Sequence, residues 1–536
     1  MTGSIEAPGH SLLISVAMPT FDPGERHLRG AIESVRAQRY PRWELCVADD
    51  GSRDPRVGQV LSEYASRDSR ITVQSAQRNS GISAASNRAV AMCRGEYVAF
   101  LDHDDAITGD ALSEVARAID ADPSVDVVYT DQDKLTRRGA RVAPFLKPDW
   151  SPVYALGAMY VGHLLVVRRS LLAEVGGFDS SFDGIQDFEL MLRISERTER
   201  IRHLPRVLYH WRAIPGSIAA GVDEKPGIPE LQARAVSEHL HRRGVAACAT
   251  PHPQIPHRAR LVPEPRADHP SVSVIVPRVG EQRHLDRCLD SLGRTAYPGL
   301  DVVVADPAGA RRPSTILNGG VARASGEHLV FLAPHAEIVE EDWIEALLAH
   351  GGIPGVGVVG ALSVYPDGRV REAGLALRRW SANGAARTSA WWHGGSPAEP
   401  IMRGAAGDGD GYYGSLSCAR EVGAVSDSCM LVAREAFDRV GGFAEEYRAH
   451  YHDVDLCLRI RRHLGLEVVY TPRPRVRSHE PPSLARRDDV IDRALVVDRW
   501  FDELDDGDPY LNRHLTVDMT PVTPDRGLLR RIASLR

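Results

Sequence analysis

The amino-acid sequence repeats itself, because five segments of its first half recur in the same order in its second half. The pairs are 15–19 (SVAMP) with 273–277 (SVIVP), 40–49 with 297–306, 95–101 (GEYVAFL) with 326–332 (GEHLVFL), 175–178 with 440–443 (both VGGF), and 186–194 (QDFELMLRI) with 452–460 (HDVDLCLRI). Five matches in one order are hard to obtain by chance, and they indicate two copies of one domain. A chain of 536 residues is also too long for a single hydrophobic core.

Each copy is predicted to be an α/β domain. In the first copy, helix-like segments alternate with short β-branched runs at 13–18, 45–48, 71–74 and 97–101. Strands that alternate with helices form βαβ units and a mostly parallel, Rossmann-like sheet that is covered on both faces. The sequence therefore predicts two such domains in tandem.

Composition suggests where the domains begin and end. We place the first domain at residues 1–225, a linker with a Pro/His/Arg-rich end at 226–268, the second domain at 269–500, and a C-terminal tail at 501–536. A loop-rich insert at 378–411 is expected to interrupt the second copy.

Charge and cysteine content narrow the class of protein. The net charge of −7 argues against a protein that binds nucleic acid through its phosphates. No run approaches the roughly 20 apolar residues that span a bilayer. The seven cysteines are scattered and none forms a Cys-x-x-Cys pair, so we expect free thiols and a cytoplasmic protein.

The end of the strand-like run at 95–101 carries an acidic cluster, Asp102-His103-Asp104-Asp105. If the extended backbone continues, Asp102 and Asp104 lie on the same side of it, since side chains alternate along a strand. Two such carboxylates suit Mg²⁺ or Mn²⁺, which bind through a few carboxylates together with substrate phosphates. A solvated acidic turn explains the same motif, and the motif alone does not decide between the two.

Two further loops follow predicted strands of the same sheet. One contains Asp22, and the other contains Asp49 and Asp50 within an Asp-Asp-Gly-Ser segment. Ligands of such sheets bind at the carboxyl ends of the strands, where a carboxylate accepts hydrogen bonds from a base or a ribose. Asp-Asp-Gly-Ser is also a favourable turn sequence. Three polar strand ends on one edge favour a shared site for a nucleotide and a metal.

Three residues later in the first copy complete the candidate site. Asp187 precedes an amphipathic helix, where an acid either stabilises the helix N-terminus or serves as a general base. His210 is a candidate metal ligand and equally a structural histidine. Arg212 is a candidate partner for a diphosphate leaving group.

Together these motifs resemble the family-2 glycosyltransferases of the GT-A fold, and more closely the two-domain bacterial enzymes that build O-antigen and other surface polysaccharides. The resemblance rests on segments 49–52, 79–83, 101–105, 129–134, 147–152, 176–178, 186–190 and 208–212 of the first copy, and on 441–443, 453–459 and 508–512 of the second. It covers nearly the whole chain.

The resemblance implies a metal-dependent, inverting transfer of a hexosyl or deoxyhexosyl unit from a nucleotide-sugar donor to a glycan or lipid-linked glycan acceptor. It assigns nucleotide binding to Pro19, Thr20, Asp22, Asp49 and Asp50. It assigns the Mn²⁺ or Mg²⁺ site to Asp102 and Asp104 with His210, and it makes Asp187 the catalytic base. The chain lacks the Gln-x-x-Arg-Trp motif of processive synthases, so we expect addition of one or a few sugars.

The second copy has lost the acids of the first. Asp50 corresponds to Pro307, Asp102 to Ala333 and Asp104 to His335. Because losing the metal carboxylates removes the stabilisation of the leaving group, we expect this copy to be inactive and to bind the acceptor or act as a scaffold.

Two other functions stay open. The first is a non-catalytic scaffold that binds sugars or nucleotides. The presence of Asp102, Asp104 and Asp187 in the first copy disfavours this function. The second is a nucleotidyltransferase. A Gly-rich phosphate loop after the first strand would favour that function, and this chain lacks such a loop. A short basic amphipathic stretch at 528–536 leaves peripheral docking at the inner face of a membrane open.

Overall fold

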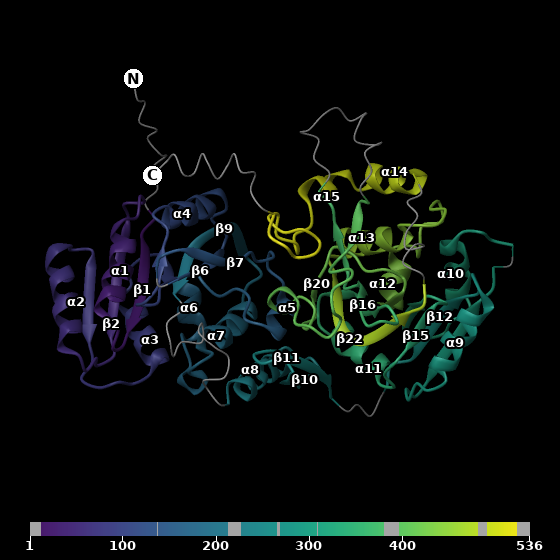
Figure 1. Cartoon of the computed structure of the whole chain (residues 1–536), viewed down its shortest axis with the longest axis horizontal. Helices are drawn as coiled ribbons and strands as arrows, with labels where there is room; N and C mark the ends of the chain where they lie inside the picture. The colour runs from purple at the N-terminus through teal and green to yellow at the C-terminus, as the bar shows by residue number, and fades with distance from the viewer. Residues whose placement is uncertain are drawn as a thin grey trace, which may run out of the picture. The chain divides into compact units, whose positions relative to one another are not determined.

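The computed structural model describes residues 12–136, 138–212, 227–264, 269–307, 309–379, 396–480 and 490–522 (Figure 1). Contacts divide the chain into two compact units. The first unit holds residues 1–150, 159–239 and 251–257, and the second holds 151–158, 240–250 and 258–536. We describe each unit by itself.

The first unit is built on a nine-stranded sheet with the strand order β3-β2-β1-β4-β8-β6-β9-β5, and β7 pairs with β6. Its strands are β1 (Ile14–Thr20), β2 (Trp43–Asp49), β3 (Ile71–Ser75), β4 (Tyr97–Phe100), β5 (Ala106–Ile107), β6 (Val127–Leu135), β7 (Arg141–Phe145), β8 (Leu165–Arg168) and β9 (Ile201–Arg212). Its helices are α1 (Glu25–Arg36), α2 (Pro55–Arg67), α3 (Ile82–Met92), α4 (Ala111–Ala121), α6 (Arg169–Val175) and α7 (Gln186–Ser195), with a 3₁₀ turn at Ser180–Phe182.

The predicted α/β class is confirmed, and the sheet is mostly parallel. β1 pairs in parallel with β2 and β4, and β2 pairs in parallel with β3. β8 runs antiparallel between β4 and β6, so those two strands keep the common direction. β5 and β7 are the other antiparallel strands. Every strand end that carries a predicted nucleotide contact therefore points to the same edge.

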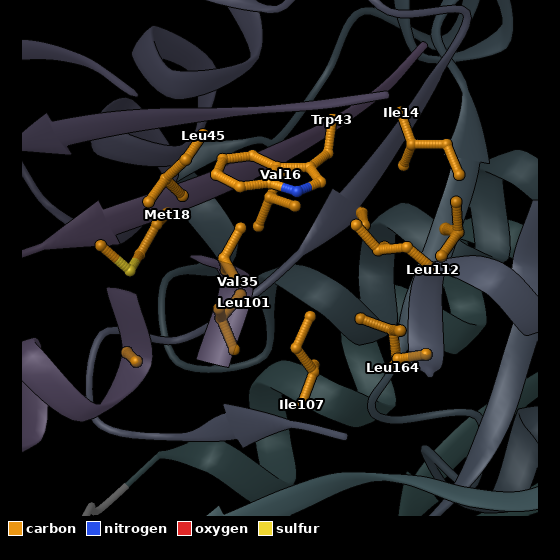
Figure 2. Close-up of a cluster of buried hydrophobic side chains, with 14 of the residues drawn as sticks. Ile14, Val16, Met18, Val35, Trp43, Leu45, Leu101, Ile107, Leu112 and Leu164 are labelled. Carbon is orange, nitrogen blue, oxygen red and sulfur yellow. The ribbon is translucent and has the colours of Figure 1, made fainter. Parts of the chain in front are cut away.

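The core of this unit forms where periodic apolar positions meet. Val16 and Met18 alternate to one face of β1, where Trp43 and Leu45 of β2 join them (Figure 2). Helices α1, α2 and α4 add their apolar stripes to the same cluster, and Leu112 of α4 is labelled in the view. Burial at roughly 25 cal/mol per Å² of apolar surface fixes which face of each strand turns inward. The packing of the strands therefore fixes where the loops at their ends begin.

The second unit repeats this sheet, with the strand order β13-β12-β14-β21-β16-β22-β15. Its strands are β10 (Ala247–Pro251), β11 (Ala259–Pro263), β12 (Val272–Pro277), β13 (Leu300–Ala305), β14 (His328–Leu332), β15 (Ala336–Ile338), β16 (Val356–Val364), β17 (Val370–Glu372), β18 (Leu375–Leu377), β19 (Ala398–Pro400), β20 (Arg420–Glu421), β21 (Cys429–Ala433) and β22 (Glu467–Ser478). Its helices are α5 (Pro152–Gly157), α9 (Gln282–Leu292), α10 (Pro313–Val321), α11 (Trp343–Gly351), α12 (Arg434–Arg439), α13 (His452–Leu464), α14 (Val490–Arg499) and α15 (Phe501–Asp506), with a 3₁₀ turn at Tyr412–Gly414. The order matches β2-β1-β4-β8-β6-β9-β5 strand for strand. Within the described part of this unit, β3 has no counterpart.

Individual contacts are duplicated as well. The Asn87 side chain accepts from the backbone N–H of Phe178 and donates to its carbonyl, at 2.9 and 2.8 Å. Asn318 makes the same pair of bonds with Phe443, at 3.0 and 2.9 Å. Each asparagine thereby ties its helix, α3 or α10, to the Gly-Gly-Phe turn. The two units are copies in their hydrogen bonding as well as in their topology.

The region expected to be a linker is folded along much of its length. It contains α8 (Ile228–Arg242) and the two-stranded sheet of β10 and β11. The α5 segment, which follows the first copy's β7 in sequence, packs with the second unit. The amphipathic stretch at 528–536 and part of the insert at 378–411 lie outside the described residues.

Two sequence expectations about the whole chain can be compared with the structure. All seven cysteines are free thiols, as expected. A search of the described helices finds none with the length and apolar character needed to cross a membrane.

Candidate active site of the first unit

The loops after β1 and β2 lie side by side at the carboxyl edge of the sheet. Thr20 pairs with Asp49 in the parallel register, and the Thr20 carbonyl accepts from the backbone N–H of Asp50 at 2.8 Å. Asp22 ties the loops together, because its carboxylate accepts from the backbone and side chain of Arg53 at 2.7 and 2.6 Å. The predicted nucleotide loops therefore meet as the sequence suggested.

Among the described residues of these loops, Thr20 carries a buried hydroxyl that lacks a partner. Thr20 is 1% exposed, and its Oγ1 makes no hydrogen bond to any described residue. A buried hydroxyl without a partner costs about 1–3 kcal/mol, so this atom is suited to a ligand. Pro19 precedes it on β1, and the Pro19 carbonyl lies 3.4 Å from Nδ1 of His103.

The carboxylates of Asp49 and Asp50 both accept hydrogen bonds from nearby backbone N–H groups. Asp50 is buried, and its Oδ2 accepts from the backbone N–H groups of Ser80 and Gly81, both at 2.9 Å, while Oδ1 pairs with Arg88. Asp49 Oδ1 accepts from the Ser52 N–H at 3.1 Å. Asp50 thus shapes the loop that leads into α3, which the reasoning from strand ends did not foresee.

The acidic cluster is a turn, which corrects the expectation of alternating side chains. β4 ends at Phe100, and the backbone N–H of Asp105 donates to the carbonyl of Asp102 at 3.2 Å. In such a turn the first and fourth residues approach each other. Asp102 and Asp105 therefore come together, whereas extended backbone would have paired Asp102 with Asp104.

Asp102 and Asp105 form a candidate metal site with His163. One ligand atom from each of the three residues lies within 4.8 Å of the others. His163 Nε2 is 3.8 Å from Asp102 Oδ2, and the imidazole stacks on the Tyr209 ring at 4.6 Å between centroids. Two carboxylates and an imidazole are ligands that Mn²⁺ and Mg²⁺ sites use. The ligand set fits a divalent cation.

The other two predicted metal ligands lie outside this group. Asp104 offers its backbone carbonyl to the Arg212 guanidinium at 2.9 Å. His210, on β9, bonds through Nδ1 to Asp133 Oδ1 at 2.6 Å. The sequence did not predict Asp105 or His163 as metal ligands. Asp105 stood within the motif but was passed over because of the assumed alternation, and no sequence signal pointed to His163.

Asp105 is held from two sides. It is fully buried, and its carboxylate accepts from the Tyr209 hydroxyl and the Arg212 N–H, both at 2.7 Å. Burial, together with the charges of Asp102 and Asp104, raises the pKa of Asp105 well above its usual range. Arg212 therefore supports the acidic turn, through its backbone N–H here and its guanidinium at Asp104.

Asp187 lies in the first turn of α7, where the charges of His163 and Asp102 act on it. Its Oδ1 accepts from the Phe188 N–H at 2.9 Å. Burial raises the pKa of Asp187; the Asp102 charge raises it further, while His163 and the Phe188 N–H act in the opposite direction. A carboxylate with a raised pKa is a stronger proton acceptor than an exposed one.

A buried lysine holds the His163 segment in place. Lys147 is fully buried, and its Nζ donates to the carbonyls of Thr130, Val161 and His163 at 2.6, 2.5 and 2.6 Å. Its fourth acceptor is Gln132 Oε1 at 3.1 Å, and that oxygen also accepts from the His163 N–H at 3.0 Å. Lys147 stood in a family-like motif, but nothing in the sequence indicated this role.

The second unit has the same frame without the acids. Ala333 and His335 occupy the positions of Asp102 and Asp104 after β14. Asp453 repeats the Asp187 contact, since its Oδ1 accepts from the Val454 N–H at 2.9 Å.

The strand register identifies the second-copy counterparts of His210 and Arg212. Ala106 pairs with His210 in the first unit, and the equivalent Glu337 pairs with Arg477 in the second. Arg477 thus replaces His210, and the nearby His479 corresponds to Arg212. Among the described residues, the second unit contains no group of three metal-ligating side chains within range of one another.

Comparisons with known proteins relate the sequence to a family. Residues 15–176 match the model of glycosyl transferase family 2. The chain is 36% identical to the uncharacterized protein y4gI of Sinorhizobium fredii, over 94% of this chain and 58% of that protein. It is also 36% identical to the O-antigen biosynthesis protein RfbC of Myxococcus xanthus, over 97% of this chain and 41% of that protein. The chain therefore spans about half the length of these relatives.

A solved structure also matches, more distantly. The crystal structure of Staphylococcus aureus TarS 1-349 in complex with UDP-GlcNAc is 22% identical, over 43% of this chain and 66% of that chain, with a TM-score of 0.37. A likeness of this size supports no further argument. The family match covers β1, β2 and β4, which carry the candidate nucleotide loops and the acidic turn, and the first unit contains a glycosyl transferase family 2 domain.

Proposed function

We propose that the protein is an inverting glycosyltransferase that moves a hexosyl or deoxyhexosyl unit from a nucleotide-diphosphate sugar to a glycan acceptor. One observation carries the proposal: three separate segments bring Asp102 and Asp105, His163, and Asp187 into one electrostatically connected cluster. A single-displacement transfer needs a base for the acceptor hydroxyl and stabilisation of the departing diphosphate, and Asp187 beside a divalent-cation site would supply both.

The acidic turn and His163 would hold Mn²⁺ or Mg²⁺ together with the donor diphosphate. Such an ion stabilises the charge that develops on the departing nucleotide diphosphate. The chain's own contribution is to keep the ligands in place: Tyr209 and Arg212 fix Asp105, and Lys147 fixes the His163 backbone. Asp104 and His210, the other predicted ligands, remain candidates for contact with the bound donor.

The nucleotide would lie over the loops after β1 and β2. The Thr20 hydroxyl is available to a base or a ribose, beside Pro19 and Asp22. Asp49 would contact the ligand directly, whereas Asp50 would act by holding the loop at Ser80 and Gly81.

Asp187 would accept the proton of the acceptor hydroxyl as that oxygen attacks the anomeric carbon. The C–O bond forms on the face opposite the departing nucleotide diphosphate, so the anomeric configuration inverts. The raised pKa of Asp187 matches this role, because a base works best with a pKa nearer the working pH.

The relatives suggest the biological setting. The similarity to an O-antigen biosynthesis protein supports an acceptor that belongs to a bacterial surface polysaccharide, and we extend the proposal to a lipid-linked glycan. The second unit, which lacks the acids of the metal site, would be catalytically inert.

The test is release of nucleotide from a panel of nucleotide-diphosphate sugars by the full chain, with and without Mn²⁺. We expect metal-dependent release from at least one donor, reduced at least about 100-fold in Asp102→Asn. The same change at Asp122, which is exposed at the end of α4, is the matched control and should leave the rate unchanged. Failure of every donor, or full activity of Asp102→Asn, would contradict the proposal and favour a binding scaffold.

A further inference from the structure

The second unit contains a cavity of about 280 Å³ at the edge that corresponds to the active site of the first. Ala333 and His335 line it at the positions of the lost acids, and Asp453 lines it at the position of the proposed base. The second unit therefore has a cavity at the positions where the first unit carries the acids of the candidate metal site. Its volume is near the lower end of small-molecule sites, which begin at about 300 Å³, and suits a single small ligand.

Two buried nitrogen atoms on the cavity wall have unmet hydrogen-bonding capacity. Arg371 Nε and His335 Nε2 are both buried, and neither has a hydrogen-bond partner among the residues described, although His335 Nε2 lies 3.6 Å from Glu480 Oε2. The rest of the Arg371 guanidinium bonds Ser428 Oγ at 2.8 Å and Glu480 Oε2 at 2.7 Å. Each unmet group costs about 1–3 kcal/mol unless a ligand or water bonds to it. Arg371 Nε–H would donate to an oxygen of a bound molecule, and His335 Nε2 would bond a hydroxyl group of the same molecule.

The charge of the lining excludes an anionic ligand. The carboxylates on the wall are Glu281, Asp427, Asp453 and Glu480, and Arg371 is the one guanidinium among the lining residues. Arg371 is already balanced by Glu480, and by Glu372 at 3.0 Å. A nucleotide diphosphate or a phosphate would meet net negative charge here with no metal site to offset it.

The remaining chemistry fits a neutral molecule with several hydroxyl groups. Asp427 pairs with His452 Nε2 at 3.1 Å, so the lining offers both hydrogen-bond acceptors and donors. Burial, and next the Arg371 charge, lower the pKa of His335, so its neutral imidazole offers one donor and one acceptor. Leu317 and Leu332 supply apolar surface for the C–H face of a ring.

We propose that this cavity is a metal-independent binding site for a neutral sugar residue. The assignment of that sugar to the acceptor glycan rests on the proposed function, and the site would then hold one unit of the glycan that the first unit extends. The sugar of a nucleotide donor is the other source of the same chemistry, and the experiment below separates the two.

The experiment is saturation-transfer NMR on the full chain with methyl glycosides of glucose, galactose, mannose, rhamnose and N-acetylglucosamine. We expect at least one glycoside to receive saturation, in EDTA as well as in buffer. Excess nucleoside diphosphate with Mn²⁺ should leave the signal in place. Displacement by that mixture would assign the signal to the donor site and overturn the proposal, as would the absence of transfer to any probe.

Two variants locate the site. Ala333→Phe should fill the cavity, and Asp427→Asn should remove one acceptor without changing its size; each should reduce the saturation signal at least fivefold. Asp367→Asn, an exposed change in the same unit, is the matched control. If Ala333→Phe lowers the Tm, Asp427→Asn decides alone, and a signal that survives it overturns the proposal. Metal-dependent nucleotide release tests the other unit, so either proposal can fail while the other stands.

Discussion

The raised pKa of Asp187 links the stability of the fold to the proposed activity. Burial raises the pKa of this carboxyl, so its ionised form is disfavoured in the folded protein. A raised pKa stabilises the fold fully below the unfolded-state pKa, and that contribution disappears as the pH rises through the folded-state pKa. At neutral pH the charge of Asp187 therefore lowers the stability of the fold, and the proposed role as a base is what this charge would serve.

Asp187→Asn should slow sugar transfer strongly and leave the fold intact. We expect a loss of about 10²–10⁴-fold in transfer rate, the usual contribution of a general base. Its Tm at pH 8 should equal or exceed that of the wild type, because the amide oxygen can still accept from the Phe188 N–H. The wild-type rate should rise with pH as Asp187 loses its proton. Wild-type transfer by the variant, or a large fall in its Tm, would contradict the account.

Lys147→Met should weaken metal binding from a distance. Removing Nζ leaves the carbonyls of Val161 and His163 without their buried donor, which costs at least about 3 kcal/mol. The His163 segment then loosens, so Mn²⁺ affinity should fall together with the Tm. Lys134→Met is the matched control: Lys134 lies 5.2 Å from the Trp211 ring, a contact worth about 1 kcal/mol. Full Mn²⁺ affinity in Lys147→Met would contradict the proposal that Lys147 positions His163.

Sequence reasoning found part of this site. Asp102 and Asp187 could be predicted because each sits at a boundary that periodicity reveals, a strand end and a helix start. Asp105 was passed over because a two-residue period holds only while the backbone stays extended, and here it turns. His163 lies in a loop whose path depends on Lys147, a tertiary contact that no local pattern encodes.

At the scale of elements, the α5 segment is joined to the second unit by a buried acid. Glu421 on β20 is 1% exposed and accepts from the Val153 and Tyr154 N–H groups at 2.8 and 3.3 Å. Burial raises the pKa of Glu421 to about 7. The fold therefore favours the protonated carboxyl, and this stabilisation is lost as the pH rises from about 4.5 through about 7.

Glu421→Gln should flatten the pH dependence of unfolding. A shift from about 4.5 to about 7 corresponds to about 3 kcal/mol, which the wild type loses on going from pH 4 to pH 8 and the variant keeps. The Tm difference between variant and wild type, measured by calorimetry, should therefore grow in favour of the variant as the pH rises. Glu435→Gln, at a side chain that is 84% exposed, should show no such trend. A constant difference for Glu421→Gln would contradict the assignment.

Most elements could be predicted, but their placement could not. Apolar periodicity marks α1 and β1 in the sequence because one face of each is buried. The direction of β8, which runs antiparallel between two parallel strands, depends on the path of the preceding loop. The same holds for α5: its sequence position suggests the first domain, and its packing partner is Glu421 of the second.

At the scale of the whole molecule, one fold is used twice with different chemistry. Both units keep the sheet order, the asparagine contact with the Gly-Gly-Phe turn, and an acid at the start of the α7 or α13 helix. The first unit adds a group of metal-ligating side chains, and the second keeps a polar cavity. We therefore propose sugar transfer for the first unit and sugar recognition for the second.

The most direct test of the metal assignment is a titration of the full chain with Mn²⁺, followed by electron paramagnetic resonance in the presence of a nucleoside diphosphate. The account predicts that Asp105→Asn and His163→Gln each weaken Mn²⁺ binding at least about tenfold. Asp104→Asn and His210→Gln should bind within about threefold of the wild type, since neither side chain belongs to the group. Loss of Mn²⁺ in the second pair of variants, with wild-type affinity in the first, would contradict the account.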